Sequence, residues 1–379
     1  TPGWVKERWV GTDDTGATEA NPGGSGAPNN MVKVEAYVYD AGAAAKNGNL
    51  TQMTRWENAS TTRVTNYGYD FRNRRTSLTG EVNTKDLYTY DNLDRITQVD
   101  RKNGATDVLI GRQTVNYDYR DRVYQRLTYA VNPSTGAVGN SLKDDFWYDP
   151  SGNLMLYTAP GTGALNKANY DGVGQVKKRY VTWNATAPTY ATASVVTNDT
   201  VMRQEEFTYD AASNVIQQTS RERFHNATGT GELQTPSTEP KARVSYVALY
   251  PDALGREQAS ADYGTNAAAA FSRPATIPAR SDTVLINSTA YNTAGEAYQT
   301  TDPKGVVTES TFDHAGRLTG KVEDVGGLAR ETQYAYNADG RLQTLTAKNS
   351  VTGDQLTQYF YGATLTESVE RLGEHHSTT

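Results

Sequence analysis

One nine-residue motif returns along this chain in ten degenerate copies, and this recurrence constrains the fold more than any other feature. The clearest form is YDNLDRITQ, which begins at Tyr90. The aromatic residues that mark the copies are, in order, Tyr69, Tyr90, Tyr117, Tyr148, Tyr170, Tyr209, Tyr250, Tyr291, Phe312 and Tyr336. A unit that recurs over most of a chain is typical of a repeat protein, in which neighbouring units bury a surface together.

Each copy has the pattern of a strand, a tight turn and a second strand. In most copies an aromatic residue stands two places before the motif Tyr, as Tyr88 does before Tyr90, and alternate residues of a strand share a face. The following Asp can accept hydrogen bonds from backbone N–H groups ahead of it, and a later Gly tolerates the positive φ that closes a hairpin. The predicted positions of positive φ are Gly255, Gly316 and Gly340, with Asp94, Asp121 and Asn214 where Gly is missing.

A single hairpin is marginally stable in water, so neighbouring hairpins are expected to pair. We therefore predict an all-β fold: an array of antiparallel β-hairpins that forms one continuous curved or spiralling sheet, with strands of about five or six residues.

The array is expected to span residues 31–366. Residues 1–30 are expected to form an N-terminal strand around Trp4–Val10 and a flexible Gly- and Pro-rich loop, and residues 367–379 a C-terminal tail. Insertions that we expect to be loops between repeats lie at 131–141, 158–169, 225–241 and 262–283.

The composition fits a sheet whose two faces are both partly solvated. Only 36% of the 379 residues are hydrophobic, whereas there are 25 Tyr, whose rings pack along strands while the hydroxyl stays in water. There is no Cys and no run of about twenty apolar residues, so neither disulfides nor a transmembrane helix is predicted. A formal charge of −6 with scattered Lys and Arg argues against nucleic acid as a partner. The opening TPGWVKERWV has no initiating Met, which indicates a segment of a longer polypeptide.

The histidines give no catalytic or metal-binding motif. They are His225, His314, His375 and His376. His314 occupies a variable turn position of its repeat, and the adjacent pair stands in the predicted tail. No segment has the ligand density of a calcium loop either.

Two pairs of acids need the same test, because two carboxylates can carry out hydrolysis. Asp144 and Asp145 are adjacent, and Asp91 and Asp94 belong to one turn. Turn-bound Asp is expected from hairpin chemistry alone. We therefore predict a protein that is not an enzyme, with no catalytic, cofactor-binding or metal-binding residue and no cofactor.

Aromatic residues raise an alternative, because Tyr and Trp also stack on sugar rings. Trp56, Trp147 and Trp183 are the candidates, although cross-strand aromatic ladders would use the same residues without a ligand. Asn-x-Ser/Thr triplets are about as frequent as chance gives in a chain this rich in Ser and Thr, so glycosylation is not supported. They begin at Asn58, Asn184, Asn198, Asn226 and Asn287.

The motif resembles the YD-repeat or Rhs-repeat family, most strongly at Tyr88–Thr97, Thr311–Thr319 and Tyr334–Leu342, and the similarity covers residues 31–350. The resemblance implies an all-β spiral of hairpins. In bacterial polymorphic toxins and insecticidal toxin complexes, such spirals form a hollow shell that holds an unfolded toxic segment, and in teneurin-type proteins a comparable shell serves adhesion. Closed shells of the family come from far longer chains, and the plug with self-cleaving aspartates that ends many bacterial shells has no counterpart here.

Three functions are compatible with these features. The first is a structural, non-catalytic shell segment of a large secreted or surface-exposed bacterial protein, which encloses a toxin cargo or forms an extracellular scaffold and has the rest of its own polypeptide as partner. The second is an adhesion module that binds a glycan or another cell-surface partner. The third, a protein that crosses an outer membrane with strands, is disfavoured by the short expected strands, which alternate Tyr with Thr, Gln and Arg. If the sheet edges are unpaired, the isolated chain should self-associate.

Overall fold

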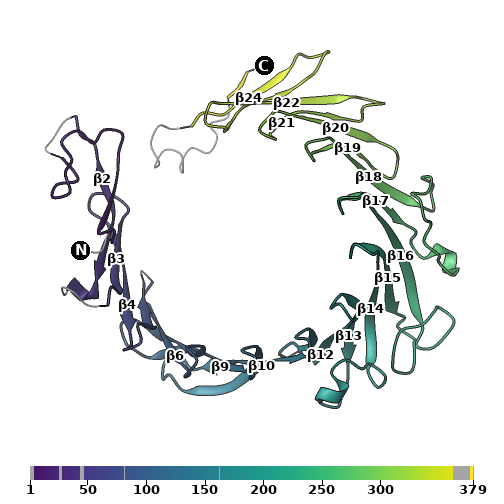
Figure 1. Ribbon diagram of the computed structural model, residues 1–379, viewed down its shortest axis with the longest axis horizontal. Helices are drawn as coiled ribbons and strands as arrows, with labels where there is room; N and C mark the ends of the chain where they lie inside the picture. Colours follow the sequence, from purple (N-terminus) through teal and green to yellow (C-terminus); the bar gives the residue numbers. More distant parts are fainter. Residues whose placement is uncertain are drawn as a thin grey trace. The chain divides into compact units, whose positions relative to one another are not determined.

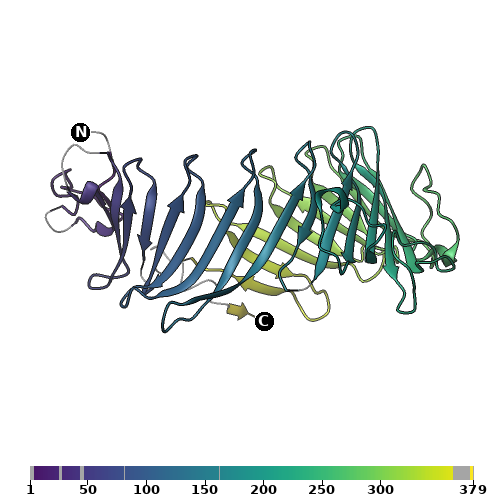
Figure 2. The same cartoon turned by 90° about the horizontal axis from the view of Figure 1, so that it is seen from below.

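The computed structural model describes residues 4–24, 28–42, 47–80, 82–161 and 163–361, and the backbone of 376–378. The fold is all-β, as predicted: the strands belong to one antiparallel sheet, and the pairings run between strands that are consecutive in sequence. Contacts between Cα atoms divide the chain into two units, Thr1–Ala164 and Leu165–Thr379. Within each unit, successive strands follow one another around a curve (Figures 1 and 2).

The first unit begins with β1 (Glu7–Val10) and β2 (Val32–Tyr39), which flank the Gly- and Pro-rich loop. The remaining strands are β3 (Leu50–Trp56), β4 (Thr62–Tyr69), β5 (Arg75–Thr79), β6 (Thr84–Tyr90), β7 (Ile96–Asn103), β8 (Leu109–Tyr117), β9 (Val123–Val131), β10 (Val138–Tyr148) and β11 (Leu154–Thr158). A 3-10 helix, η1 (Asp40–Gly42), follows β2.

The second unit starts within β12 (Ala164–Tyr170). Its other strands are β13 (Val176–Trp183), β14 (Thr200–Tyr209), β15 (Val215–Arg223), β16 (Ala242–Pro251), β17 (Glu257–Asp262), β18 (Leu285–Tyr291), β19 (Ala297–Thr301), β20 (Val307–Phe312), β21 (Leu318–Glu323), β22 (Arg330–Tyr336), β23 (Leu342–Ala347), β24 (Gln355–Gln358) and β25 (His376–Thr378). Two 3-10 helices, η2 (Tyr190–Thr192) and η3 (Asn266–Ala268), lie in its loops. None of the helices in the described ranges is long and apolar enough to span a bilayer.

Many strands are longer than the five or six residues that we predicted. β10 has 11 residues, and β14 and β16 have 10 each. The insertion at 131–141 contributes to this, because its two ends belong to strands: Val131 ends β9, Val138 begins β10, and the two residues pair. The insertion at 158–169 likewise contains the start of β12. When both faces of a sheet are solvated, a strand has polar residues on both of them. The sequence then shows no alternation of apolar and polar residues from which the end of the strand could be predicted.

The motif hairpins whose register is described carry a β-bulge beside the turn, with the extra residue on the strand that follows it. Thr89 pairs with Gln98 but Tyr90 pairs with Ile96, so Thr97 is the extra residue on β7. The same shift precedes Tyr336, where Gln343 is the extra residue. A bulge increases the local right-handed twist. Its repetition at these turns explains why the sheet curves regularly within a unit.

Two small cores in the second unit depart from the purely thin wall that the composition suggested. Tyr180, Val196, Val201, Leu233 and Ala242 form one cluster, in which Tyr180 and Leu233 are each 2% exposed. The other joins Ala248, Tyr250, Ala259, Ala261 and Ile286, with Phe271 against it. Val196, Leu233 and Phe271 come from the loops between strands. The insertions therefore fold onto the sheet and stabilise it locally.

Candidate functional site

The motif turn is a compact polar structure built around its Asp. In the copy at Tyr90, Oδ1 of Asp91 accepts hydrogen bonds from the backbone N–H groups of Leu93 and Arg95, at 2.9 and 3.0 Å. Oδ2 accepts a 2.7 Å hydrogen bond from Nε of Arg95. Asp94 takes a φ of +63°, as predicted. The carboxylate thus fixes both the turn and the arginine that follows it.

Five turns share this Asp–Arg pair: Asp70 with Arg74, Asp91 with Arg95, Asp118 with Arg122, Asp252 with Arg256, and Asp313 with Arg317. The positive-φ predictions also hold at Asp121, Gly255, Gly316 and Gly340. The prediction for Asn214 is wrong, because Ser213 has the positive φ of +71°. Asn214 instead stands in for the arginine: its amide nitrogen donates to Oδ2 of Asp210 at 3.0 Å.

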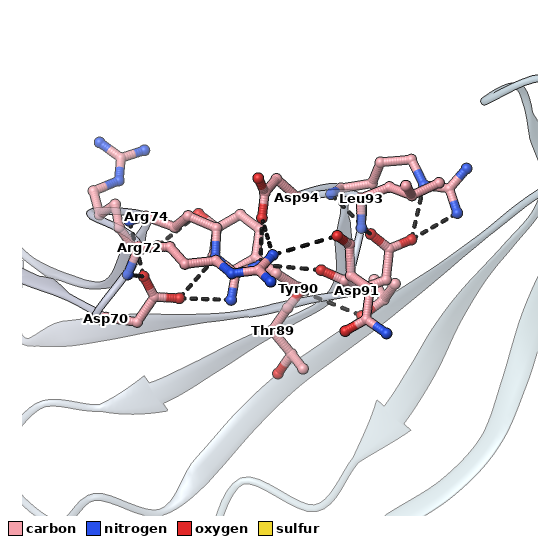
Figure 3. Close-up of polar contacts among 12 residues, drawn as sticks. Asp70, Arg72, Arg74, Thr89, Tyr90, Asp91, Leu93 and Asp94 are labelled. Atoms are coloured by element: carbon pink, nitrogen blue, oxygen red, sulfur yellow. Dashed lines mark hydrogen bonds and ion pairs between the residues drawn. The ribbon is translucent and has the colours of Figure 1, made fainter.

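The same arginine reaches the next hairpin. Figure 3 shows Arg74, which donates from Nη1 to the Asp91 carbonyl at 3.0 Å and to Oδ1 of Asp94 at 2.7 Å. Its guanidinium also lies 4.7 Å from the centroid of the Tyr90 ring. A cation this close to a desolvated aromatic face is attracted to it. Asp91 and Asp94 therefore bind different arginines and act as turn residues.

The motif tyrosine completes the connection in the opposite direction. Its hydroxyl donates to the backbone carbonyl five residues after the turn Asp or Asn of the preceding hairpin. Examples are Tyr90 to Arg75, Tyr117 to Ile96, Tyr148 to Val123, Tyr209 to Val176, Tyr291 to Glu257, Tyr336 to Leu318 and Tyr361 to Leu342. We call this set of repeated Asp, Arg and Tyr contacts the turn ladder.

The electrostatics of the turn ladder follow from these contacts. The side-chain hydrogen bonds from Arg256 and Arg317 hold the pKa values of Asp252 and Asp313 below their ordinary range. Burial opposes this in Asp91, but the hydrogen bonds from Arg95 prevail and its pKa is also lowered. Burial raises the pKa of Tyr250 to about 12. Asp91, Asp252 and Asp313 are thus charged and Tyr250 is neutral at physiological pH.

One interruption of the turn ladder is repaired from a distance. Asn214 carries no charge that could lie over the Tyr250 ring. Arg273, which comes from a later loop, places its guanidinium 4.4 Å from the centroid of that ring. Arg273 also donates to the carbonyls of Ile216 and Leu249 at 3.0 and 2.8 Å. The sequence pattern showed that Arg often follows the turn, but not that it binds the next Tyr. Arg273 has no motif around it that could have identified it.

The other residues weighed from sequence are scattered. His225 and His314 lie in exposed turns, His376 is in β25, and His375 falls outside the described residues. Oδ1 of Asp144 accepts a hydrogen bond from the Tyr157 hydroxyl at 2.8 Å. Asp145 binds Gln125 and Lys143, both at 2.8 Å. The two carboxylates therefore have separate partners.

The three tryptophans differ in exposure. Trp183 is 51% exposed, whereas the Trp147 indole N–H is buried and finds no hydrogen-bond partner among the described residues. Trp56 is partly buried and lies 5.2 Å from the Lys33 ammonium. Trp147 faces Leu156 across the β10–β11 pair, so of the three candidates Trp183 has the ring most accessible to a ligand.

Fold and turn ladder together define a repeat protein made of stacked β-hairpins. No family model matches the chain, and no curated protein matches it in sequence. Among solved structures, the chain is similar to TcdB2-TccC3 without its hypervariable C-terminal region, with 13% identity over 88% of this chain and 18% of that one and a TM-score of 0.38. A Photorhabdus luminescens Tc holotoxin pore gives 15% identity over 95% and 18% of the two chains, with a TM-score of 0.39. A porin-like protein from Bacteroides uniformis gives 10% identity over 78% and 92%, with a TM-score of 0.13.

The chain therefore spans about a fifth of the length of the two toxin chains, 18% in each case. TM-scores of this size do not establish a common fold.

Proposed function

We propose that this chain is a structural, non-catalytic wall segment of a large secreted or surface-exposed bacterial protein of the YD-repeat or Rhs-repeat type. The wall encloses a cargo such as a toxin segment, or forms an extracellular scaffold. The observation that carries the proposal is the turn ladder, in which the same kinds of contact recur between successive hairpins along the sheet. Repetition of one interface along a sheet extends a surface, which is what a wall requires.

The state of the motif side chains supports a structural role. The Asp, Arg and Tyr side chains are the groups of a copy best suited to take part in a reaction, and they bind one another. In the copy at Tyr117, for example, Oδ2 of Asp118 accepts Nε of Arg122 at 2.8 Å, and that guanidinium lies 4.5 Å from the Tyr148 ring. Groups held in this way stabilise the hairpins and have little freedom to act on a substrate.

The experiment uses the full-length polypeptide that contains this chain. Arg95 and Arg122 are both replaced by Ala. Limited proteolysis then measures how fast the segments outside this chain, including the proposed cargo, are digested. If the wall encloses a cargo, opening the turn ladder should expose that segment and speed its digestion. Arg330→Ala is the matched control, because Arg330 is an exposed arginine of β22 outside the turns. Equal digestion of the parent protein, the double variant and Arg330→Ala would argue against enclosure. Enzymatic activity that belongs to the wall segment itself, and not to the cargo, would argue against a structural role.

The second candidate function is adhesion through a cell-surface glycan. It is supported by Trp183, whose ring is 51% exposed at the end of β13. Retention of the purified chain on a glycan array tests it, with Trp183→Ala as the comparison. Absence of retention at micromolar concentration would remove this candidate and leave the wall proposal unaffected.

A further inference from the structure

Three neighbouring turns of the first unit carry large apolar side chains that are mostly exposed to solvent. Phe71, Leu93 and Tyr119 occupy central positions of the turns between β4 and β5, β6 and β7, and β8 and β9. They are 87%, 68% and 86% exposed. Tight turns favour Gly, Pro, Asn, Asp and Ser, so solvated rings at their tips need an explanation. We call these three residues the turn-tip row.

The turn-tip row lies along one edge of the sheet. Strands β4 to β9 pair antiparallel in sequence order, so the turns that follow β4, β6 and β8 are at the same edge (Figure 2). Paired strands are about 4.8 Å apart, which places consecutive tips of the row about 10 Å apart. The three apolar tips therefore stand apart in a line, and each is surrounded by solvent on most sides.

An arginine accompanies each aromatic tip. The guanidinium of Arg72 lies 5.7 Å from the centroid of the Phe71 ring, and that of Arg120 lies 5.5 Å from the centroid of the Tyr119 ring. An apolar side chain beside a guanidinium suits the boundary between lipid and water, because the first can enter the acyl region while the second meets phosphate. Both groups are present at the two outer tips of the row.

The charges around the turn-tip row are balanced. The three turns, each counted from its Asp to the Arg four residues later, contain five Arg and five Asp, in a chain whose formal charge is −6. The exposed carboxylates of Asp94 and Asp121 bind Arg74 at 2.7 Å and Arg95 at 2.6 Å. A paired carboxylate is less costly to remove from water than an isolated one. This edge can therefore approach lipid without presenting the net negative charge of the chain.

We infer that the turn-tip row docks on the surface of a phospholipid bilayer, with its three apolar side chains among the lipid headgroups. A bilayer interface is fluid and covers each tip on all sides, whereas a protein partner would need a separate socket for each one. A second copy of this chain, placed edge to edge, would bring tips against tips and leave most of each ring in water. The inference goes beyond the proposed functions, because neither the wall nor the glycan candidate depends on these three residues.

Flotation of the chain with vesicles of phosphatidylcholine tests the inference. We expect the chain to float with these vesicles. The bound fraction should change little when phosphatidylserine is added or salt is raised, because the charges at this edge are balanced. Binding only to vesicles that contain phosphatidylserine, with release by salt, would assign the binding to a basic surface elsewhere and overturn the inference. Absence of flotation with both kinds of vesicle would overturn it as well.

Phe71→Ser should weaken vesicle binding about tenfold, as expected when one large apolar side chain no longer enters the interface. The triple variant that adds Leu93→Ser and Tyr119→Ser should not float. Because these side chains are exposed in the free chain, both variants should keep the urea midpoint of the parent chain, which shows that the fold is retained. Val82→Ser is the matched control: Val82 is 73% exposed in the turn between β5 and β6, at the opposite edge of the sheet, and the variant should bind like the parent chain.

Two further outcomes would contradict the inference. If Val82→Ser weakens binding as much as Phe71→Ser does, the vesicles bind any exposed apolar residue and the row has no special part. Sedimentation equilibrium without vesicles tests the second copy as an alternative occupant. A dimer that the triple variant abolishes, together with equal flotation of the triple variant and the parent chain, would assign the turn-tip row to contact between copies.

Discussion

The guanidinium of Arg95 lies 4.7 Å from the centroid of the Tyr117 ring on the following hairpin, and the Tyr117 hydroxyl donates to the Ile96 carbonyl beside that arginine. One contact runs forward along the array and the other runs back. Each hairpin is therefore fixed by its neighbour through two different groups. In a repeat array such nearest-neighbour contacts decide where the structure opens first.

Replacement of Arg95 tests how far this connection depends on guanidinium geometry. Arg95 binds Asp91 through Nε at 2.7 Å and Asp121 through Nη1 at 2.6 Å. Lys keeps the charge but cannot bind both carboxylates with fixed geometry. We expect hydrogen exchange in β7 and β8 to be faster in Arg95→Lys, and faster still in Arg95→Ala. Arg120→Ala, which removes an exposed arginine outside the Asp–Arg pairs, should leave exchange in these strands unchanged; an equal effect of all three changes would contradict the prediction.

Tyr117→Phe isolates the hydroxyl contact. It removes the 2.9 Å hydrogen bond to the Ile96 carbonyl but keeps the ring under Arg95. We expect the free energy of unfolding to fall by about 1 kcal/mol, the usual net value of one such bond. Urea denaturation followed by tyrosine fluorescence measures it. Tyr119→Phe is the matched control, because Tyr119 is 86% exposed and should show no change.

Some turn glycines have a positive φ and others do not. Adding one methyl group, by replacing Gly with Ala, should therefore change stability differently at the two kinds of position. Gly316 has a φ of +75°, so Gly316→Ala should destabilise the chain by about 1 kcal/mol. Gly172 belongs to a comparable turn, but it lacks a positive φ and a Cβ added there would meet open space. Gly172→Ala should therefore be close to neutral. Thermal unfolding of the two variants compares them directly, and equal melting temperatures would mean that strain at the turn is not limiting.

The sequence predicted what depends on local chemistry. Gly316, Gly340 and Asp121 have the expected positive φ because the backbone of a tight turn admits few residue types there. The all-β array followed from the same turns. At Asn214 the prediction failed by one position, since Asn suits both a left-handed turn and a hydrogen bond to the Asp side chain, and only the structure shows which is used.

Contacts between distant segments could not be predicted in the same way. Arg273 replaces a missing arginine of the turn ladder from a loop without any motif, 57 residues from the Ile216 carbonyl that it binds. The ion pairs of Glu35 with Arg8 and Arg55 depend on strand register across β1 to β3, and a shift of one residue would separate these side chains. Polar strands such as β10 gave no alternation from which their length or register could be read.

Acid should weaken the array through the turn carboxylates. The hydrogen bonds from the arginines lower the pKa values of Asp252 and Asp313 in the folded chain relative to the ordinary value of 3.8. The unfolded chain then binds more protons in this region of pH, so stability is fully present above the ordinary value and is lost as pH falls through the lowered folded values. Urea midpoints measured from about pH 6 down to about pH 2 should decrease accordingly.

Asp313→Asn provides the control for this pH dependence. Asn337 occupies the corresponding place in the next copy and accepts the Arg341 backbone N–H at 2.9 Å, so the turn tolerates Asn. The variant should show a smaller loss of stability on acidification than the parent chain. An unchanged slope would assign the acid sensitivity to other carboxylates.

A buried ion pair in the second unit makes the largest prediction. The Lys167 ammonium lies 2.7 Å from Oδ2 of Asp199, and the two side chains are 1% and 3% exposed. Lys167 also donates to the carbonyls of Thr192 and Val195 at 2.9 and 2.5 Å, so it ties the loop between β13 and β14, residues 184–199, to β12. Lys167→Met leaves the Asp199 charge buried without its cation and should cost about 3–5 kcal/mol of unfolding free energy.

The double variant Lys167→Met with Asp199→Leu separates charge from packing. Replacing both members of a buried ion pair by apolar residues is often neutral or stabilising, whereas removing one is not. We therefore expect the second change to recover most of the stability that the first one loses, as measured by urea denaturation. Thr182 and Asn184, which donate to Asp199 at 3.0 and 2.8 Å, would lose their acceptor, so recovery should be incomplete. If the double variant is less stable than Lys167→Met, Lys167 and Asp199 stabilise the loop at 184–199 mainly through these hydrogen bonds. Neutralisation of the Asp199 charge by Lys167 would then be the smaller contribution.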